Sequence, residues 1–309
     1  MNNFIMMIGL PGAGKDYFIE NTLKHTYPNA IILSSDDIRE EIFNDVNDQT
    51  HNSEVFSIMK ARTLNALKNG HDVIYNATNI SAKKRMALLS QLPKCRKIAY
   101  LMLADIDLVF HNNTTRTRNV PEDVIYKMYK SFQMPHSSEG FDDIILSIYE
   151  NPAYFTSLEL ESSLNIMCEH DNPHHTLSCG EHCKQAEIEM MNLIRDSYYI
   201  YDKDYCIILL LAARYHDLCK YKCKTFDKEK GIAHFYGHEY VSAYDFLTLS
   251  GGGEMFGLTK DKALLVANLI NDHMSYFSGN NRVESICKTK GSVYKELLDI
   301  LHTADVNAH

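Results

Sequence analysis

Several features that mark whole classes of protein are missing from the 309-residue sequence. Its apolar runs are all shorter than the ~18 residues that a membrane-spanning helix needs. The apolar run at residues 4–8 follows Met1-Asn2-Asn3 without a basic segment, which is not the pattern of a secretory signal. We therefore expect a cytoplasmic protein with no membrane partner.

Cysteine is also scarce, with eight residues and no Cys-x-x-Cys. So few thiols exclude a disulfide scaffold. Two Cys-x3-Cys pairs, Cys179/Cys183 and Cys219/Cys223, place both thiols on one helical face. Buried small residues explain this spacing more simply than a metal site does.

An excess of positive charge is missing too, because the net charge is −9. Residues 1–150 carry 16 Lys and Arg against 18 Asp and Glu, and residues 151–309 carry 15 against 22. This balance excludes a basic coat for long duplexes, so a nucleic-acid substrate would be held as a short end in a cleft. Of the 15 histidines, 10 follow residue 150, which favours metal binding in the second half.

The first part of the chain alternates short β-rich apolar runs with helical segments. Strands are predicted at 4–8, 30–33, 72–75 and 97–102, and helices at 16–24, 37–43, 55–68, 82–91 and 121–132. Continuous apolar strands separated by helices indicate a parallel sheet covered on both faces. Beyond a boundary near 150, the pattern is nearly all helical, with helices predicted at 181–197, 203–216, 239–249, 259–273 and 292–304.

Residues 9–15 follow a predicted strand and precede a predicted helix, as a phosphate-binding loop requires. The residues predicted to bind ATP are Gly9, Leu10, Pro11, Gly12, Ala13, Gly14, Lys15 and Asp16. The glycines let backbone N–H groups converge on phosphate oxygens, and Lys15 reaches the outer phosphates. Asp16 stands where a Ser or Thr hydroxyl usually binds Mg²⁺. A carboxylate also binds Mg²⁺, so the pattern leaves open whether Asp16 merely replaces a hydroxyl.

Asp36, Asp37 and Arg39 follow the second predicted strand, at the sheet edge where ligands of open α/β sheets bind. A carboxylate there can take the proton from an attacking hydroxyl, and Arg39 can hold a phosphate as a bidentate fork. Alternatively, one of the two carboxylates caps the helix that follows. Arg116 and Arg118 lie in a predicted loop after the last strand and indicate a lid over the transferred phosphoryl group.

With these motifs, residues 1 to about 145 resemble the 5′-hydroxyl polynucleotide kinase branch of P-loop phosphotransferases. The matching pieces are Gly9–Lys15, Asp36-Asp37-x-Arg39, Ala77-Thr78-Asn79 with Arg85, and Arg116-x-Arg118-Asn119-Val120-Pro121. The resemblance implies that Asp36 is the general base and that Arg39 binds the phosphate next to the acceptor nucleoside. It implies a role in stabilising the γ-phosphoryl group for Lys15, Arg116 and Arg118. The family often has Asp where this chain has Asn76, a second departure from the pattern.

The second half contains a series of residues suited to binding metal. His216 and Asp217 are adjacent at the end of an apolar helical run, and His182 and Asp305 lie on other predicted helices. This nitrogen and oxygen set suits Mn²⁺, Fe²⁺, Ni²⁺, Zn²⁺ or Mg²⁺ without selecting among them. A single histidine is commonly structural, but the ordered series favours a metal site.

The series resembles the HD phosphohydrolase superfamily. The stretch from His216 to Glu239 looks most like HD domains of RNA end-processing and tRNA-maturing proteins, which act on 2′,3′-cyclic phosphates and 2′- or 3′-phosphomonoesters. The resemblance implies that the metal ligands are His182, His216, Asp217 and Asp305. Further residues that would support these ligands, bind phosphate or hold a second metal are His175, Lys220, His238 and His273.

The two resemblances together predict an α/β P-loop kinase domain at residues 1–150, followed by an all-α HD domain at residues 151–309. The expected activity is nucleic-acid end healing: ATP-dependent phosphorylation of 5′-hydroxyl ends and metal-dependent hydrolysis of 2′,3′-cyclic phosphate or 2′/3′-phosphomonoester ends. The expected cofactors are ATP, Mg²⁺ and a divalent transition metal (Mn²⁺, Ni²⁺, Fe²⁺ or Zn²⁺). The expected partners are RNA ends, in preference to DNA, and a separate ligase.

Two alternatives remain open at the level of sequence. In the first, both halves act on small molecules, as a nucleoside or nucleotide kinase fused to a small-nucleotide phosphohydrolase. In the second, the P-loop half is a regulatory nucleotide-binding domain and only the HD half is catalytic. Asp16 and Asn76 are the residues that support the second alternative.

Overall fold

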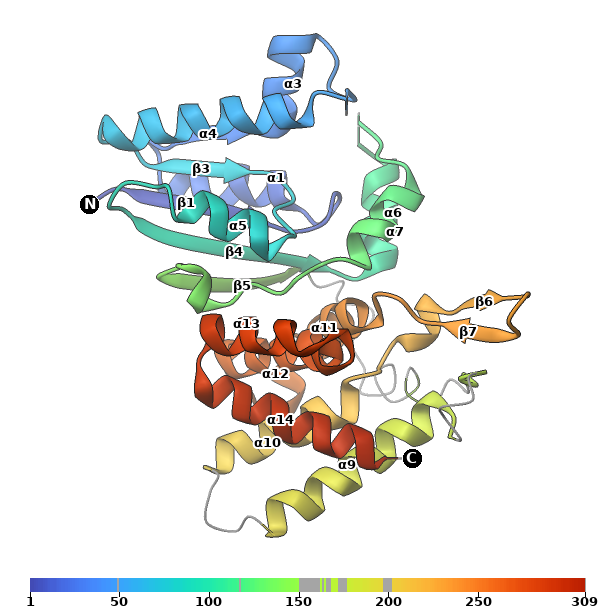
Figure 1. Ribbon diagram of the computed structural model, residues 1–309. Coiled ribbons are helices and arrows are strands. Elements are labelled where there is room, and N and C mark those ends of the chain that lie inside the picture. Colours follow the sequence, from blue (N-terminus) through green and yellow to red (C-terminus); the bar gives the residue numbers. More distant parts are fainter. Residues whose placement is uncertain are drawn as a thin grey trace. The chain divides into compact units, whose positions relative to one another are not determined.

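The structure is a computed structural model (Figure 1) that describes residues 1–48, 50–116, 118–149, 162, 164, 168–171, 177–196 and 202–308. The chain forms two compact units. Unit 1 comprises Met1–Met128 and Pro135–Glu150, and unit 2 comprises Tyr129–Met134 and Asn151–His309. The short segment Tyr129–Met134 therefore packs with the second unit although it lies within the first half of the sequence.

Unit 1 is built on a five-stranded sheet in the order β2-β3-β1-β4-β5, with every neighbouring pair parallel. The strands are β1 (Asn3–Ile8), β2 (Ile31–Ser34), β3 (Val73–Asn76), β4 (Arg96–Ala104) and β5 (Asp143–Tyr149). The parallel α/β prediction is thus confirmed. The sequence analysis missed β5, an edge strand that follows a segment rich in Pro and Gly and is only partly buried.

The helices of unit 1 connect these strands. They are α1 (Lys15–Phe18), η1 (Ile19–Leu23), α2 (Lys24–Thr26), α3 (Ser35–Phe43), α4 (Asn52–Lys68), α5 (Ala82–Leu89), α6 (Ile106–Thr114), α7 (Glu122–Tyr129) and η2 (Ser137–Glu139). Successive residues of a strand point to opposite faces. All of Phe4–Ile8 is nevertheless fully buried, so helices cover both faces of the sheet. On one face, Ile19 and Leu23 pack against Ile5 and Met7.

Unit 2 is mostly helical in its described part. Its helices are α9 (Cys179–Asp196), α10 (Lys203–Tyr215), η3 (Lys220–Cys223), α11 (His238–Leu249), η4 (Glu254–Phe256), α12 (Lys260–Asp272), η5 (His273–Ser278), α13 (Asn280–Lys290) and α14 (Ser292–Asn307). Helix α9 packs on α10 and α14, and α12 packs on α10 and α11. The sequence analysis missed α13.

A small antiparallel sheet makes the expectation of an all-α second domain wrong in one place. The strands β6 (Thr225–Asp227) and β7 (Ile232–His234) form a hairpin. Its connection includes Gly231 at φ +66°, a backbone conformation that glycine adopts without a steric penalty. Strands of three residues are too short for a period-2 hydrophobic pattern to reveal.

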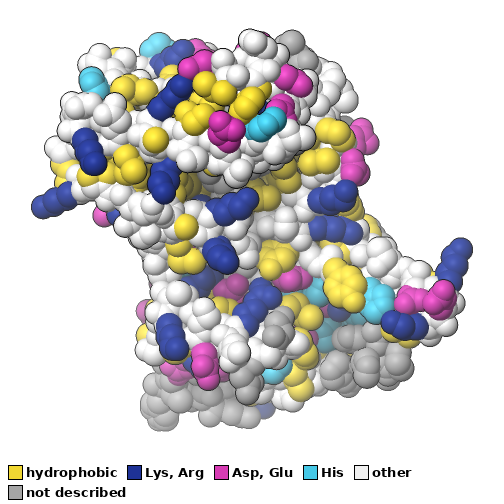
Figure 2. Space-filling model, turned by 45° about the horizontal axis from the view of Figure 1, so that its top comes forward, with side chains coloured by type: hydrophobic (Ala, Val, Ile, Leu, Met, Phe, Trp, Pro, Cys, Tyr) yellow, Lys and Arg dark blue, Asp and Glu magenta, His cyan; other side chains and the backbone are white. Residues whose placement is uncertain are grey.

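Within the described residues, no helix is both long enough and apolar enough to span a membrane. On the face drawn in Figure 2, Lys and Arg side chains stand singly among acidic, apolar and neutral ones and form no continuous basic surface. This distribution agrees with the overall acidic composition.

Candidate active sites

The loop between β1 and α1 fits closely against its surroundings. A Cβ atom at Gly9 would lie 2.6 Å from the Met102 carbonyl oxygen, and one at Gly12 would lie 2.5 Å from the Val109 carbonyl oxygen. Gly12 also has φ +85°. A side chain fits at neither position, so glycine lets the loop pack closely against β4 and α6. The loop, a cradle of residues 9–15, connects a strand to a helix N-terminus, the setting in which backbone N–H groups bind phosphate.

Lys15 lies inside this cradle. Its Nζ atom donates hydrogen bonds to the carbonyl oxygens of Gly9, at 3.1 Å, and Leu10, at 2.8 Å. The pKa of Lys15 is lowered to about 8, mainly by burial; Asp16 opposes this shift and Arg116 adds to it. The polyphosphate of a nucleotide would supply the negative charge that this ammonium group lacks in the cradle.

The carboxylates of the acidic residues after β2, Asp36 and Asp37, do not cap helix α3. The N-cap of α3 is Ser34, whose side-chain oxygen accepts from the backbone N–H groups of Asp36 and Asp37. The alternative that one of these two carboxylates caps the helix is therefore wrong. Asp36 Oδ1 instead accepts from Arg39 Nη1 at 3.0 Å and also pairs with Arg118. The structure thus brings together three of the predicted catalytic residues.

Asp16, which follows the P-loop lysine, accepts hydrogen bonds from two residues distant in the sequence, Asn76 and Arg116. Its Oδ1 accepts from Asn76 Nδ2 at 2.7 Å, and its Oδ2 accepts from Arg116 Nη2 at 3.0 Å. A cavity of ≈ 200 Å³ beside these groups is lined by Asp16, Ile19, Glu20, Ile32, Ser34, Asp37 and Asn76. The pKa of Asp37 is raised by burial and by the nearby carboxylates of Asp36 and Asp16.

Two contacts in unit 1 were missed by the sequence analysis. Asn112 Nδ2 on α6 donates to the Gly12 carbonyl oxygen at 3.0 Å and so supports the loop from behind. Arg85, named above as a motif residue, is buried and forms a two-pronged pair with Glu139, with N–O distances of 2.6 and 2.7 Å. Arg85 therefore holds α5 to the segment before β5. A sequence separation of 54 residues gives no local signal for this pair.

The candidate metal ligands of unit 2 lie at or near helix ends. His216 is the C-cap of α10, His273 is the C-cap of α12, and His238 is the first residue of α11. His182 lies in the first turns of α9 and Asp305 in the last turns of α14. All five are buried, as is Asp217.

Backbone carbonyl groups set the orientation of all four histidines. The Nδ1 atoms of His216, His238 and His273 lie 2.7–2.9 Å from carbonyl oxygens three residues earlier, and His182 Nδ1 lies 3.0 Å from the Ala308 carbonyl oxygen. The last carbonyls of a helix lack partners within the helix and are free to accept such bonds. Protonation at Nδ1 leaves Nε2 as the coordinating atom, the arrangement typical of metal-binding histidines.

The Nε2 atoms and the carboxylates converge on one centre. His182 Nε2 lies 3.2 Å from His216 Nε2 and 2.9 Å from Asp305 Oδ1. His238 Nε2 lies 3.2 Å from His273 Nε2 and 3.1 Å from Asp217 Oδ1. Acceptor atoms this close repel one another unless a proton or a cation lies between them. The donor set therefore fits a divalent cation.

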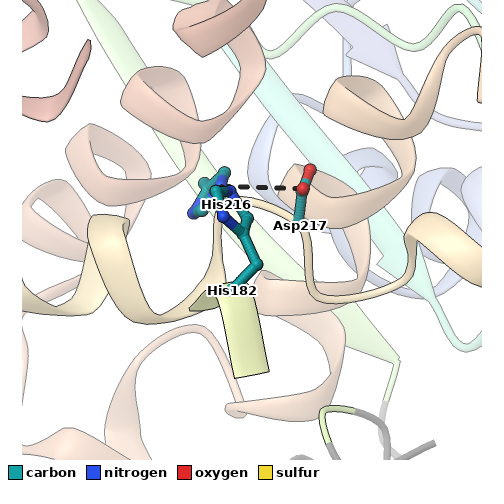
Figure 3. Close-up of side chains that lie close together, drawn as sticks. All are labelled: His182, His216 and Asp217. Carbon is teal, nitrogen blue, oxygen red and sulfur yellow. Dashed lines mark hydrogen bonds and ion pairs between the residues drawn. The ribbon is translucent and has the colours of Figure 1, made fainter. Parts of the chain in front are cut away.

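Asp217 is shared by two groups of possible ligands. One group comprises His182, His216 and Asp217 (Figure 3), and the other comprises Asp217, His238 and His273. Asp217 Oδ1 is buried and has no hydrogen-bond partner, although it lies near His238 and His273. A carboxylate in this position can bind one ion through each oxygen atom.

The charges around the cluster are coupled. Burial alone would lower the pKa of His216, but Asp217 and Asp305 outweigh it and raise the pKa to about 9. Burial would raise the pKa of Asp217, but Lys220 and His216 hold it well below the usual range. For His273, burial and the neighbouring imidazoles lower the pKa to about 3. A metal ion bound at His216 would displace its proton.

The remaining predicted residues of unit 2 differ in their placement. Lys220 is buried and its Nζ donates to Asp217 Oδ2 at 2.8 Å, so it stands beside the proposed ligands. His175 lies outside the described residues. The sequence analysis missed His170, a buried residue whose ring lies edge-on to His182, with ring centres 5.9 Å apart. Cys183 and Cys219 are buried free thiols with pKa values raised by burial, as structural cysteines are.

Comparison with known proteins gives partial matches. A family model described as an AAA domain matches residues 4–135. The L-seryl-tRNA(Sec) kinase of Methanococcus maripaludis is 26% identical over 178 residues, which are 54% of this chain and 69% of that protein. Residues 4–135 are thus similar to that domain family and carry a P-loop on a parallel α/β sheet.

Two solved structures match part of this chain. A chain in the structure of a Pnkp1/Rnl/Hen1 complex is 19% identical, with a TM-score of 0.34 and coverage of 50% of this chain and 49% of that one. A fungal RNA kinase is 16% identical, with a TM-score of 0.36 and coverage of 68% and 94%. This chain therefore spans about half the length of the first of these proteins.

Proposed function

We propose that the protein heals RNA ends with two separate active sites. Unit 1 transfers the γ-phosphoryl group of ATP to a 5′-hydroxyl group, and unit 2 hydrolyses a 2′,3′-cyclic phosphate or a 2′- or 3′-phosphomonoester. The observation that carries the proposal is that one chain contains both a phosphate cradle around Lys15 and a buried centre of four Nε2 atoms with Asp217 and Asp305. Both are sites for phosphate chemistry.

In unit 1, Asp36 accepts the proton of the attacking hydroxyl as its oxygen bonds to the γ-phosphorus of ATP and the bond from that phosphorus to the leaving ADP breaks. Asp36 stands at the carboxyl end of the sheet beside the cradle, where it is held by Arg39. Mg²⁺, when bound with ATP, neutralises charge on the β- and γ-phosphates. Lys15 stabilises the charge that develops on the transferred group. Arg116 and Arg118 pair with Asp16 and Asp36, so both must change partners to reach the γ-phosphate.

In unit 2, the buried centre positions the scissile phosphate next to a nucleophilic water. A divalent ion there would lower the pKa of a bound water and polarise the phosphoryl oxygens. Lys220 holds Asp217 Oδ2 in place and offsets its charge. Because the ligands come from helix ends that pack together, the centre is preorganised before substrate arrives.

The name of the curated relative favours a second candidate for unit 1. That relative is a kinase of seryl-tRNA, so the acceptor of this chain would then be a hydroxyl on a small group, with or without attached RNA. Such an acceptor needs the same base and cradle. The two candidates differ only in what lies beyond the acceptor hydroxyl.

One substrate tests both active sites at once. A short RNA with a 5′-hydroxyl and a 2′,3′-cyclic phosphate is incubated with the protein, ATP, Mg²⁺ and Mn²⁺ or Ni²⁺, and its intact mass is measured. Gain of one phosphoryl group at the 5′ end, with opening or removal of the 3′-terminal phosphate, supports the proposal. Phosphorylation of serine, seryl-tRNA or nucleosides, but of no RNA end, supports the second candidate. Two variants serve as controls: Lys15→Ala should lose the phosphorylation by unit 1, and Asp217→Asn should lose the hydrolysis by unit 2.

A further inference from the structure

The two departures from the P-loop pattern are in direct contact. In the usual arrangement, a Ser or Thr hydroxyl after the P-loop lysine and an aspartate at a strand end together hold Mg²⁺. This chain has Asp16 after the lysine and Asn76 at the end of β3. Asn76 Nδ2 donates to Asp16 Oδ1 at 2.7 Å. Compared with the usual arrangement, the carboxylate is on the residue after the P-loop lysine and the neutral side chain is at the strand end.

The sheet positions Asn76 for this contact. In the parallel pairing of β1 with β3, Asn76 is in register with Met7, two residues before Gly9. The Asn76 residue is 9% exposed, whereas the Asp16 side chain is 61% exposed. A buried amide thus orients an accessible carboxylate at the start of α1. An aspartate at position 76 would instead place a second negative charge beside Asp16, and like charges so close oppose the ionisation of both.

We propose that Asp16 is the protein's carboxylate for the Mg²⁺ of the bound nucleotide and that Asn76 is its positioning residue. The inference rests on the proposed nucleotide binding of unit 1 and requires no particular phosphoryl acceptor. The total charge of the pair equals that of the usual arrangement, one carboxylate and one neutral oxygen-bearing group. The adjacent cavity of ≈ 200 Å³ gives room for an ion that retains several of its waters.

Arg116 belongs to the same arrangement. Its Nη2 atom donates to the second oxygen of Asp16 at 3.0 Å. Binding of Mg²⁺ by Asp16 releases Arg116, which is then available to the γ-phosphate. A role for Asp16 as a salt-bridge partner alone would need neither Asn76 nor the accessible cavity.

The test measures nucleotide and metal binding without any acceptor. The dissociation constant of ATP is determined by calorimetry with excess Mg²⁺ and with EDTA, and Mn²⁺ bound to the protein–ADP complex is observed by electron paramagnetic resonance. Four proteins are compared with the wild type: Asp16→Ser, Asp16→Asn, Asn76→Asp and the double exchange Asp16→Ser/Asn76→Asp. Asp107→Ser removes an exposed charge elsewhere in unit 1 and is the control.

We expect Asp16→Ser and Asp16→Asn to lose about tenfold or more of the Mg²⁺-dependent gain in ATP affinity, as for loss of a group that orients or binds a metal. Both should bind metal-free ATP at least as well as the wild type, because a charge next to the phosphates is gone. Asn76→Asp should weaken metal-free ATP binding. The double exchange should restore the Mg²⁺-dependent gain to within about threefold, since it re-creates the usual arrangement.

Retention of the full Mg²⁺ effect in Asp16→Ser or Asp16→Asn would overturn the inference. The inference would also be overturned if the double exchange shows a Mg²⁺-dependent gain in ATP affinity no larger than that of the poorer single variant, although its thermal stability equals that of the control. An altered Mn²⁺ spectrum in the Asp16 variants supports it. Failure to phosphorylate RNA leaves these binding results unchanged, so the proposed acceptor and the metal role are judged separately.

Discussion

The two candidate active sites are assembled in opposite ways. The P-loop site uses seven consecutive residues, and its shape depends on glycine backbones that pass close to β4 and α6. The centre of unit 2 uses side chains on or at the ends of five helices, α9, α10, α11, α12 and α14, and His182 and Asp305 are in contact across 123 sequence positions. The first site is therefore set by local backbone geometry, and the second by the packing of distant helix ends.

This difference changes what holds each functional group in place. Lys15 is oriented by carbonyl oxygens of the loop, and Asp16 by Asn76 at the end of β3 and by Arg116; Asp16 remains accessible. The four imidazoles of the centre are buried, and backbone carbonyls orient them: Ala213 and Ile270 at the ends of α10 and α12, Phe235 before α11 and Ala308 after α14. Damage to the loop should remain local, whereas damage to the centre should affect both ligand binding and the stability of unit 2.

The largest expected effect is that of Asp217→Ala. Asp217 belongs to both ligand groups and also pairs with buried Lys220. We expect metal affinity to fall by at least about a hundredfold, the upper range for groups that only support ligands, and hydrolysis to be lost. Metal content by mass spectrometry and phosphate release from a 2′,3′-cyclic phosphate measure these effects.

A matched control separates metal binding from folding. Asp261→Ala removes a carboxylate from the exposed first turn of α12 and should change neither measurement. Asp217→Asn keeps the volume of the side chain and should lose metal while α10 stays protected from hydrogen exchange. An Asp217→Asn protein that binds metal and hydrolyses at the wild-type rate would remove Asp217 from the centre.

The second prediction concerns Lys15→Ala. Loss of one charged group aimed at the transferred phosphoryl should lower 5′ phosphorylation by about 10²–10³-fold. Metal content and hydrolysis in unit 2 should be unchanged, because the supports described for the loop, from β4, α6 and Thr78, all belong to unit 1. Radiolabel transfer from γ-labelled ATP measures the loss. A fall in both activities would show that the two sites do not act independently.

Local motifs in the sequence predicted the first site better than the second. The cradle of residues 9–15 and the sheet edge with Asp36 follow from consecutive residues and their flanking elements. The partners of Arg116 and Arg118 could not be predicted in this way, because each arginine pairs with a carboxylate far away in the sequence. The edge strand β5 and the hairpin of β6 and β7 were missed because short or half-buried strands leave little hydrophobic periodicity.

In unit 2 the residue types were predictable, but their geometry was not. His182, His216, Asp217 and Asp305 were singled out by spacing and resemblance, and their roles remain predictions. His238 was predicted only as a support, a phosphate binder or a ligand of a second metal. Its Nε2 lies 3.1 Å from Asp217 Oδ1, within the 2.9–3.2 Å range of the contacts that His182 makes with Asp305 and His216. The packing of α11 against the segment that follows α10 and includes η3 reveals this, and no local pattern encodes it.

The third prediction compares a buried and an exposed ion pair within unit 1. Glu139→Ala leaves the fully buried guanidinium of Arg85 without its two-pronged partner. We expect unit 1 to lose about 3–5 kcal/mol of unfolding free energy, the range for removing one partner of a buried pair. Urea unfolding read by hydrogen exchange in α5 and β4 measures it.

The exposed pair Arg62–Glu41 provides the comparison. Its side chains are 38% and 53% exposed, so water screens the interaction. Glu41→Ala should therefore leave the unfolding midpoint almost unchanged. Equal effects of the two substitutions would mean that Glu139 does not hold Arg85 in solution as it does in the structure.

The smallest expected effect is a proton taken up when ATP binds. Burial lowers the pKa of Lys15 in the folded protein to about 8, from an ordinary value of 10.5. Between these two values the unfolded chain binds more protons than the folded one, so this group favours the folded state increasingly as pH rises.

Bound polyphosphate raises the Lys15 pKa again. At about pH 9, ATP binding should take up a fraction of one proton, and ATP affinity should decline as pH rises further. Calorimetry in two buffers with different ionisation enthalpies measures the uptake, which should be absent in Lys15→Met. Proton release on binding, or the same uptake in Lys15→Met, would show that a group other than Lys15 titrates. In that case the two sites would not differ as described, with a single titrating lysine in the loop and many coupled charges in the centre of unit 2.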